Sequence, residues 1–305
     1  TVSTLVRCLR NAIRSDGDPR LDGLALSRAL RAQVGFELAL CGQLPGELRV
    51  TRPPRRLRSL AARVAVDVPA GPVRFTAGAV AGQGARVDLA DEALIARPYL
   101  PVAGDIMLAL EDNNPLSMYE AHPDKGGNAI DLGGRSPEAW CDALQRALGL
   151  VEEFLPALRR EMDLFIQQFV PVGYDDHQHL SASYQEDIGT IYLTLHPNLM
   201  TMTEAVIHEF SHNKLNALFE LDEVLENAWS PLYASPVRPD PRPLHGVVLA
   251  VHAFQPVARL YEAMIAAGYS RSKSPDFIRR YEQVKQINHE GAAVVLENGR
   301  PTAVG

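Results

Sequence analysis

Cysteine is scarce in this chain of 305 residues, and its three thiols, Cys8, Cys41 and Cys141, lie far apart and form no C-x-x-C pair. An odd and scattered set excludes a disulfide framework and indicates a reducing compartment. Long hydrophobic runs are also missing, and the N-terminus does not show the basic-then-apolar pattern of a signal peptide. We therefore expect a cytoplasmic protein that does not interact with a membrane.

The chain has no excess of positive charge either: its formal net charge is −7, which gives no general attraction to nucleic acid. A hydrophobic content of 46% excludes disorder by composition and allows one large core or two modest ones. One basic tract stands out, and we interpret it as a solvated or partner-facing surface. Its members are Arg49, Arg52, Arg55, Arg56, Arg58 and Arg63.

The first of two predicted regions covers residues 1–135. Its apolar residues recur at helical spacing and then alternate with a period of two from Arg63 to Leu89, which predicts helices followed by a small antiparallel sheet. Ile106–Leu110 predicts a further strand, and the long polar loop after it carries His122, an additional candidate ligand. We assign this region to substrate or partner recognition.

Residues 136–305 form the predicted catalytic region. Ser136-Pro137-Glu138 is a typical helix start, and helical spacing continues to about Phe169. The β-branched run Ile188–Leu195 predicts a strand, either an edge strand that pairs with an extended substrate or an ordinary core strand. The expected fold class is α+β, mainly helical with small antiparallel sheets and an active-site helix packed beside a strand.

The segment Ala205–His212 contains the pattern H-E-x-x-H and carries the strongest chemical signal. His208 and His212 are four residues apart, so on a helix they share one face and can hold the same metal ion. Thr201-Met202-Thr203-Glu204 precedes them as a predicted capping signature. Glu209 points beside the metal and is the candidate catalytic carboxylate.

A third protein ligand decides which chemistry follows. Leu215 and Leu218 occupy the positions where a metzincin needs glycine and histidine, which excludes that class. A zinc peptidase with a glutamate ligand would have to use Glu262. His245 and His252 are seven residues apart, two helical turns, and share a face. One of them can bind the metal while the other lies beside the metal or on the substrate.

Two arginines, Arg238 and Arg242, stand in a proline-rich tract just before His245. The prolines stiffen this predicted loop and hold both guanidinium groups in defined directions. Because a guanidinium binds a carboxylate through two parallel hydrogen bonds, the pair suits a dicarboxylic cosubstrate. The alternative is that one or both pair with Asp240 or cap backbone carbonyls.

The H-E-x-x-H helix and the tract R-P-D-P-R-P-L, within residues 180–265, resemble the HExxH-type 2-oxoglutarate-dependent peptide β-hydroxylases of peptide-modification clusters. The resemblance implies a mononuclear iron(II) centre, 2-oxoglutarate and O2 as cosubstrates, and hydroxylation of a β-carbon in a natural-product precursor peptide. The resemblance implies His208 and His212 as ligands and a third histidine, for which we favour His245, with His252 as the alternative. A third histidine departs from the usual triad of two histidines and one carboxylate.

The expected function is therefore an iron(II), 2-oxoglutarate-dependent oxygenase, with Arg238 or Arg242 binding the distal carboxylate of the cosubstrate. One alternative is a zinc metallopeptidase in which Glu209 is the general base. The candidates for stabilising its oxyanion are His179, Tyr184 and His252. The second alternative is a non-catalytic peptide-recognition module, and the sequence leaves the oligomeric state undetermined.

Overall fold

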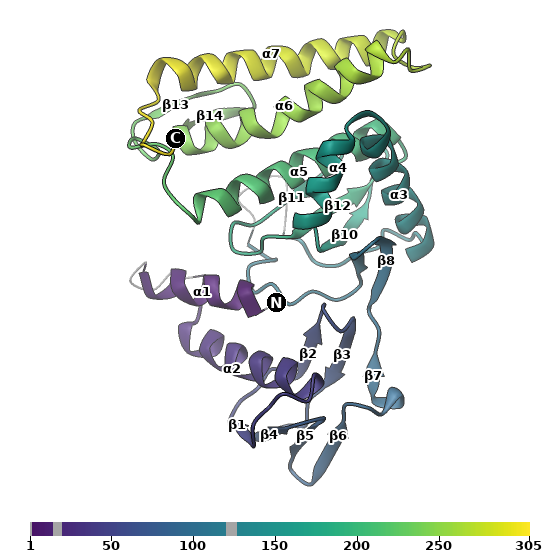
Figure 1. Cartoon of the computed structure of the whole chain (residues 1–305), viewed down its shortest axis with the longest axis vertical. Helices are drawn as coiled ribbons and strands as arrows, with labels where there is room; N and C mark the ends of the chain where they lie inside the picture. Colours follow the sequence, from purple (N-terminus) through teal and green to yellow (C-terminus); the bar gives the residue numbers. More distant parts are fainter. Residues whose placement is uncertain (1, 15–19, 120–126) are drawn as a thin grey trace. The chain divides into compact units, whose positions relative to one another are not determined.

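A computed structural model describes residues 2–14, 20–119 and 127–305 of the chain (Figure 1), so His122 lies outside the described residues. Helices combine with small sheets, and the fold class is α+β. The chain divides into two compact units. The first comprises residues 1–101, 107–132 and 170–172, and the second comprises residues 102–106, 133–169 and 173–305.

Two helices open the first part of the chain, and short strands follow them. The elements are α1 (Val2–Arg14), α2 (Gly23–Leu40), β1 (Leu48–Val50), β2 (Arg56–Ser59), β3 (Val64–Asp67), β4 (Val73–Thr76), β5 (Ala79–Gly82), β6 (Ala85–Asp88), the 3-10 helix η1 (Glu92–Leu94), β7 (Ile95–Ala96), β8 (Tyr99–Ala103) and β9 (Ile106–Ala109). One sheet has the antiparallel order β1-β4-β5-β6, and a second has the antiparallel order β2-β3-β7.

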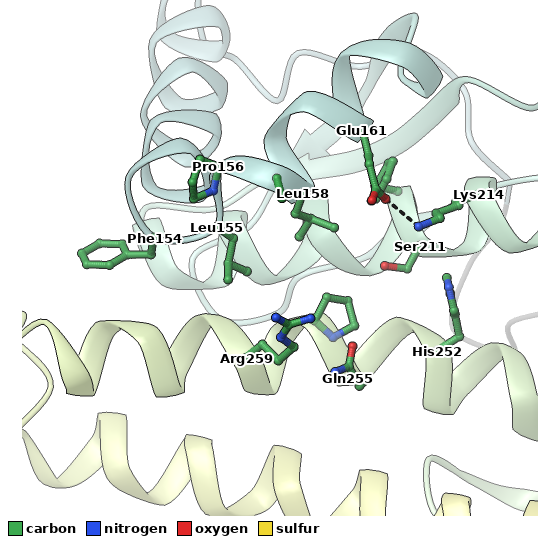
Figure 2. Close-up of a pocket in the computed structure, with 13 residues that line it drawn as sticks. Phe154, Leu155, Pro156, Leu158, Glu161, Ser211, Lys214, His252, Gln255 and Arg259 are labelled. Atoms are coloured by element: carbon green, nitrogen blue, oxygen red, sulfur yellow. Dashed lines mark hydrogen bonds and ion pairs between the residues drawn. The ribbon is translucent and has the colours of Figure 1, made fainter.

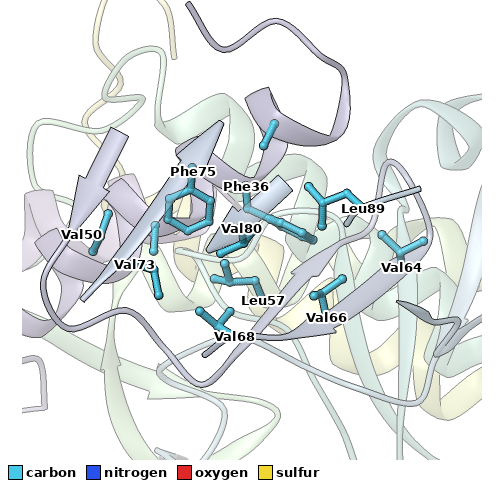
Figure 3. Close-up of a cluster of buried hydrophobic side chains, with 12 residues drawn as sticks. Phe36, Val50, Leu57, Val64, Val66, Val68, Val73, Phe75, Val80 and Leu89 are labelled. Atoms are coloured by element: carbon cyan, nitrogen blue, oxygen red, sulfur yellow. The ribbon is translucent and has the colours of Figure 1, made fainter. Parts of the chain in front are cut away.

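Helix α2 packs on both of these sheets. Asp22 starts the helix by accepting the backbone N–H groups of Leu24 and Ala25 at 2.9 and 3.0 Å. Period-two alternation directs one face of each strand to the shared core (Figure 3). The buried members of this core are Ala32, Phe36, Ala39, Val50, Leu57, Val64, Val66, Val68, Val73, Phe75, Val80 and Leu89. The strands predicted from Arg63 to Leu89 are confirmed, although they belong to two sheets. The helical spacing predicts helices up to about residue 60, and this is wrong after α2, because β1 and β2 already lie between residues 48 and 59.

The second part of the chain is mainly helical. Its elements are α3 (Pro137–Phe154), α4 (Pro156–Phe165), β10 (Gln168–Tyr174), β11 (Ser181–Ala182), β12 (Thr190–Leu195), α5 (Leu199–Phe219), β13 (Leu232–Ser235), β14 (Arg238–Pro243), α6 (Leu244–Ala266) and α7 (Pro275–Asn298). Helix α3 begins as predicted, with Ser136 as N-cap and proline in the first turn. In the described residues, no helix is long and apolar enough to cross a membrane.

Helix α5 is the central element of the second unit and packs against α3, α4, α6 and β12 (Figure 1). Buried residues lie on most of its circumference, as expected for a helix covered on several sides. Its N-cap is Asn198, whose side chain accepts the N–H of Met200 at 2.9 Å. The predicted cap at residues 201–204 is therefore wrong, because Thr203 lies inside the helix and donates its hydroxyl to the carbonyl of Leu199.

Strand β12 lies between β11 and β10, and all of its residues are buried. The prediction of an edge strand is therefore wrong, and the core-strand alternative is confirmed. The predicted helical stretch to about Phe169 also ends early, since α4 stops at Phe165. The backbone N–H of Gln168 donates to the carbonyl of Gly189, and its side chain donates to Thr190, so β10 already begins there.

The proline-rich tract is a strand rather than the predicted loop. Residues 238–243 form β14, which pairs antiparallel with β13 in a two-stranded ribbon. Proline is tolerated in such a ribbon because each strand has one edge that needs no backbone donor. Helix α6 begins immediately after β14, which places His245 in its first turn.

Candidate metal centre

The two histidines of the H-E-x-x-H pattern lie side by side on α5. The Nε2 atoms of His208 and His212 are 2.9 Å apart, and their rings are nearly perpendicular. This arrangement follows from the helix itself, since residues four apart lie one above the other on the same face. Two ring nitrogens that can each bind a metal therefore lie next to one another.

Burial lowers the pKa of both imidazoles and so favours the neutral form, which is the form that binds a metal. Burial lowers the pKa of His208 well below its usual range, and the charges of His212 and Arg280 lower it further. Burial also lowers the pKa of His212, although the nearby Glu209 opposes this effect. Both shifts favour the form of the imidazole that can bind a metal.

The spacing of the two nitrogens fits a single transition-metal ion. Zinc–nitrogen bonds are about 2.1 Å long, so two imidazole nitrogens 2.9 Å apart could both reach one metal ion. Among the residues described by the structure, no third His, Cys, Asp or Glu completes a metal-binding group. His208 and His212 are therefore the two candidate ligands that this geometry brings together.

The carboxylate of Glu209 points toward strand β11, where two hydroxyl groups hold it. Ser181 donates to Oε1 and Ser183 donates to Oε2, each at 2.7 Å. Glu209 is only 4% exposed, so these bonds replace most of its hydration. The two serines flank the single residue Ala182, which pairs with Tyr192 of β12, so the sheet fixes the position of both donors.

An ion cluster that the sequence reading missed lies one turn before His208. Glu204 accepts hydrogen bonds from Arg280 of α7 at 2.6 and 2.9 Å and from the hydroxyl of Tyr261 of α6 at 2.5 Å. Glu204 is four residues before His208, a spacing that places both side chains on the same face of a helix. The sequence pattern predicts a helix cap at Glu204 instead. The cluster ties three helices together beside the histidine pair.

The structure does not bring His245 to the histidine pair. Helices α5 and α6 run antiparallel, as three contacts along them show: Tyr261 with Glu204, Phe254 with His208, and His245 with Phe219. Phe219 is seven residues beyond His212, about 10 Å along the helix axis. The His245 ring is sandwiched between Phe219 and Trp229, with ring centroids 4.6 and 4.4 Å away.

His252 lies on α6 beside α5. Burial lowers its pKa, and the charges of Lys214 and His212 lower it further. Its ring faces a cavity of about 360 Å³ between α4, α5 and α6, where Lys214 and Glu161 form an ion pair of 2.5 Å (Figure 2). In the described part of the chain, the buried Nδ1 of His252 has no hydrogen-bond partner. The lining residues are Phe154, Leu155, Pro156, Ala157, Leu158, Glu161, Phe210, Ser211, Lys214, His252, Gln255, Pro256 and Arg259.

The two arginines of the proline-rich tract lie on β14. The Nε atom of Arg242 pairs with Asp240 at 3.0 Å, which is the alternative that the sequence left open. Arg238 lies in the register of β14 opposite Ser235. Glu262 is exposed on α6 and accepts a hydrogen bond from Tyr281 of α7.

The remaining candidates lie near β11 and β12. The ring of His179 contacts that of His196, and the ring of Tyr184 contacts that of Tyr192. His177 is exposed beside Asp176. No protein-family model matches the chain, and no curated protein matches it.

Proposed function

We propose that the chain is a mononuclear metalloenzyme, an iron(II), 2-oxoglutarate-dependent oxygenase that hydroxylates a β-carbon of a peptide or peptide-like natural-product precursor. One observation carries this proposal: two neutral imidazoles converge with their Nε2 atoms 2.9 Å apart. His208 and His212 would hold the iron. The choice of reaction comes from the resemblance of residues 180–265 to the HExxH-type peptide hydroxylases.

The environment of Glu209 supports an oxygenase rather than a hydrolase. A hydrolytic base must exchange a proton with a metal-bound water, whereas both oxygens of Glu209 already accept hydroxyl donors, from Ser181 of β11 and from Ser183 just after this strand. In our proposal, Glu209 orients β11 against α5 and opposes the lowering of the pKa of His212. When bound, iron and its cosubstrate would supply the oxidising chemistry, and the chain would position the peptide and exclude water.

The residues fit 2-oxoglutarate less well than they fit the metal. Arg242 is paired with Asp240 on β14, at the end of α6 where His245 lies level with Phe219. The charge of Arg280 lowers the pKa of His208, but the guanidinium of Arg280 is already paired with Glu204. We therefore derive no step through the cosubstrate and keep Arg238 and Arg242 as the proposed carboxylate-binding residues.

A zinc peptidase is the second candidate, and one observation favours it. The charge of Glu209 raises the pKa of His212, so this carboxylate acts on a metal-ligand candidate from close by. In that reaction Glu209 would be the general base, and glutamine at this position would abolish turnover.

Metal analysis of anaerobically purified protein, combined with an assay for succinate formation from 2-oxoglutarate, tests the proposal. We expect bound iron and succinate formation, with Glu209→Gln lowering but not abolishing it. His212→Ala should lose the metal, and His245→Ala is the matched control that should retain it. Bound zinc with peptide hydrolysis that needs no 2-oxoglutarate would support the peptidase instead.

A further inference from the structure

Three arginines form one row across the four-stranded sheet of the first unit. The strand register pairs Arg49 with Arg74, Arg74 with Ala81, and Ala81 with Arg86. Directly paired residues point to the same side of a sheet, so the three guanidinium groups share one face. We call Arg49, Arg74 and Arg86 the arginine row.

The opposite face of this sheet is the one that packs on α2. Successive side chains of a strand point to opposite faces of the sheet. Val73, Phe75 and Val80 point into the core (Figure 3), so the neighbouring arginines point away from it. The side chains of Arg49 and Arg74 are 75% and 56% exposed. A hollow of about 620 Å³ lies over the row. It is lined by Arg49, Val50, Thr51, Pro72, Val73, Arg74, Ala81, Gly82, Gln83, Gly84, Ala85 and Arg86.

The chain itself already places one carboxylate on this row. Glu47 accepts a hydrogen bond from Arg49 and pairs with Arg74 at 3.3 Å. Arg86, on the outer strand β6, has no ion-pair partner within the described residues. Asp88 follows it on the same strand face, but its carboxylate accepts the backbone N–H of Ala90.

The basic tract shares only Arg49 with the row, and two of its other arginines are paired inside the unit instead of facing solvent. Arg56 and Arg58 both pair with Glu111, at 2.6 and 2.7 Å, and Arg56 also pairs with Asp67. These two side chains are about one-quarter exposed, whereas Arg49 is three-quarters exposed. The tract that stands out in the sequence therefore divides into an internal ion cluster and a solvent-facing part.

We propose that the hollow over the arginine row binds carboxylate side chains of an extended acidic peptide. Neighbouring strands are about 4.8 Å apart, so Arg74 and Arg86, two strands apart, are separated by roughly 10 Å. In an extended peptide, acidic side chains two residues apart point to the same side and lie about 7 Å apart. The long arginine side chains can reach over the remaining distance. Arginine suits the role because its planar fork binds carboxylates through two hydrogen bonds. The site is independent of the reaction proposed for the second unit.

Three observations favour a peptide over a nucleic acid. The group of the chain itself that pairs with the row is the carboxylate of Glu47, which has the same chemistry as an acidic side chain of a peptide. The residues that line the hollow include no aromatic side chain on which a base could stack. The whole chain carries a formal charge of −7, which opposes binding of a long polyanion.

Fluorescence anisotropy with the full chain at low ionic strength tests this site. The probe is a fluorescein-labelled decapeptide of alternating glutamate and glycine, and the comparison probes are the glutamine–glycine peptide and a single-stranded DNA of equal charge. We expect the glutamate peptide to bind most tightly, with binding that weakens as salt is added. Equal binding of the glutamine peptide would overturn the proposal, and tighter binding of the DNA would assign the row to nucleic acid instead.

Charge variants give the sharper result because their effects have opposite signs. Arg74→Gln and Arg86→Gln should each weaken binding of the glutamate peptide by about threefold to fivefold, the range of single exposed ion pairs. Glu47→Gln should tighten it, since the competing carboxylate is removed. Arg97→Gln, at an exposed arginine paired with Glu92 outside the row, is the matched control and should leave affinity unchanged. Weaker binding in Glu47→Gln, or equal losses in all three arginine variants, would refute the assignment; circular dichroism checks that each variant is folded.

Discussion

Replacing Ser183 by alanine tests whether the serine pair of β11 fixes Glu209. The substitution removes one of two hydroxyl donors from a carboxylate that is 4% exposed, and the backbone of β11 is left intact. Hydrogen bonds to charged groups contribute about 1.5–3 kcal/mol, so we expect a loss of about 2 kcal/mol in the free energy of unfolding. For a unit of this size, that corresponds to a decrease in Tm of about 4–8 °C.

A double-mutant cycle separates this interaction from general effects of the substitution. In a Glu209→Gln background, the buried group is neutral and costs less to leave without a donor. Ser183→Ala should therefore cost about half as much there, which gives a coupling energy of about 1 kcal/mol between the two positions. The measurement is urea unfolding followed by circular dichroism.

Ser270→Ala is the matched control, because Ser270 is exposed in the turn after α6. It should change stability by less than about 0.5 kcal/mol. A Ser183→Ala effect no larger than this control, or a coupling energy near zero, would show that β11 does not hold Glu209. The orienting role proposed for this carboxylate would then fail with it.

Two further predictions concern the backbone and the pH dependence of stability. Gly133→Ala should lower the free energy of unfolding by at least about 3 kcal/mol, because φ is +60° and an added Cβ would lie 2.2 Å from the backbone nitrogen of Tyr174. Gly134→Ala is the control. Its φ is +69° but the space around it is open, so it should lower the free energy by only about 1 kcal/mol in the same urea titration. The pKa of Glu111 lies below its usual 4.5, since the opposing effect of burial is outweighed by Arg56 and Arg58. Its contribution to stability is therefore full above pH 4.5 and is lost as the pH falls through the folded-state pKa. Unfolding free energies measured from pH 7 to pH 3 should fall less steeply in Glu111→Gln than in the wild type, and parallel curves would contradict this.

Local patterns in the sequence were sufficient for most of the elements. Ser136 and Pro137 start α3 because an N-cap and a first-turn proline act within a few residues. Alternation between Arg63 and Leu89 produced strands because its period matches the pleat of a sheet. Errors arose where a segment joins a distant one: Gln168 enters a strand through bonds to Gly189 and Thr190.

The histidine pair is the part of the candidate site that the sequence determines by itself. His208 and His212 converge because the helical repeat aligns residues four apart, whatever surrounds the helix. Tertiary structure decided which residues surround the histidine pair, because these residues are far apart in the sequence and come together only when the helices and strands pack. Glu209 meets Ser181 across 28 residues and Glu204 meets Arg280 across 76, while His245 is held between two aromatic rings instead of beside the pair.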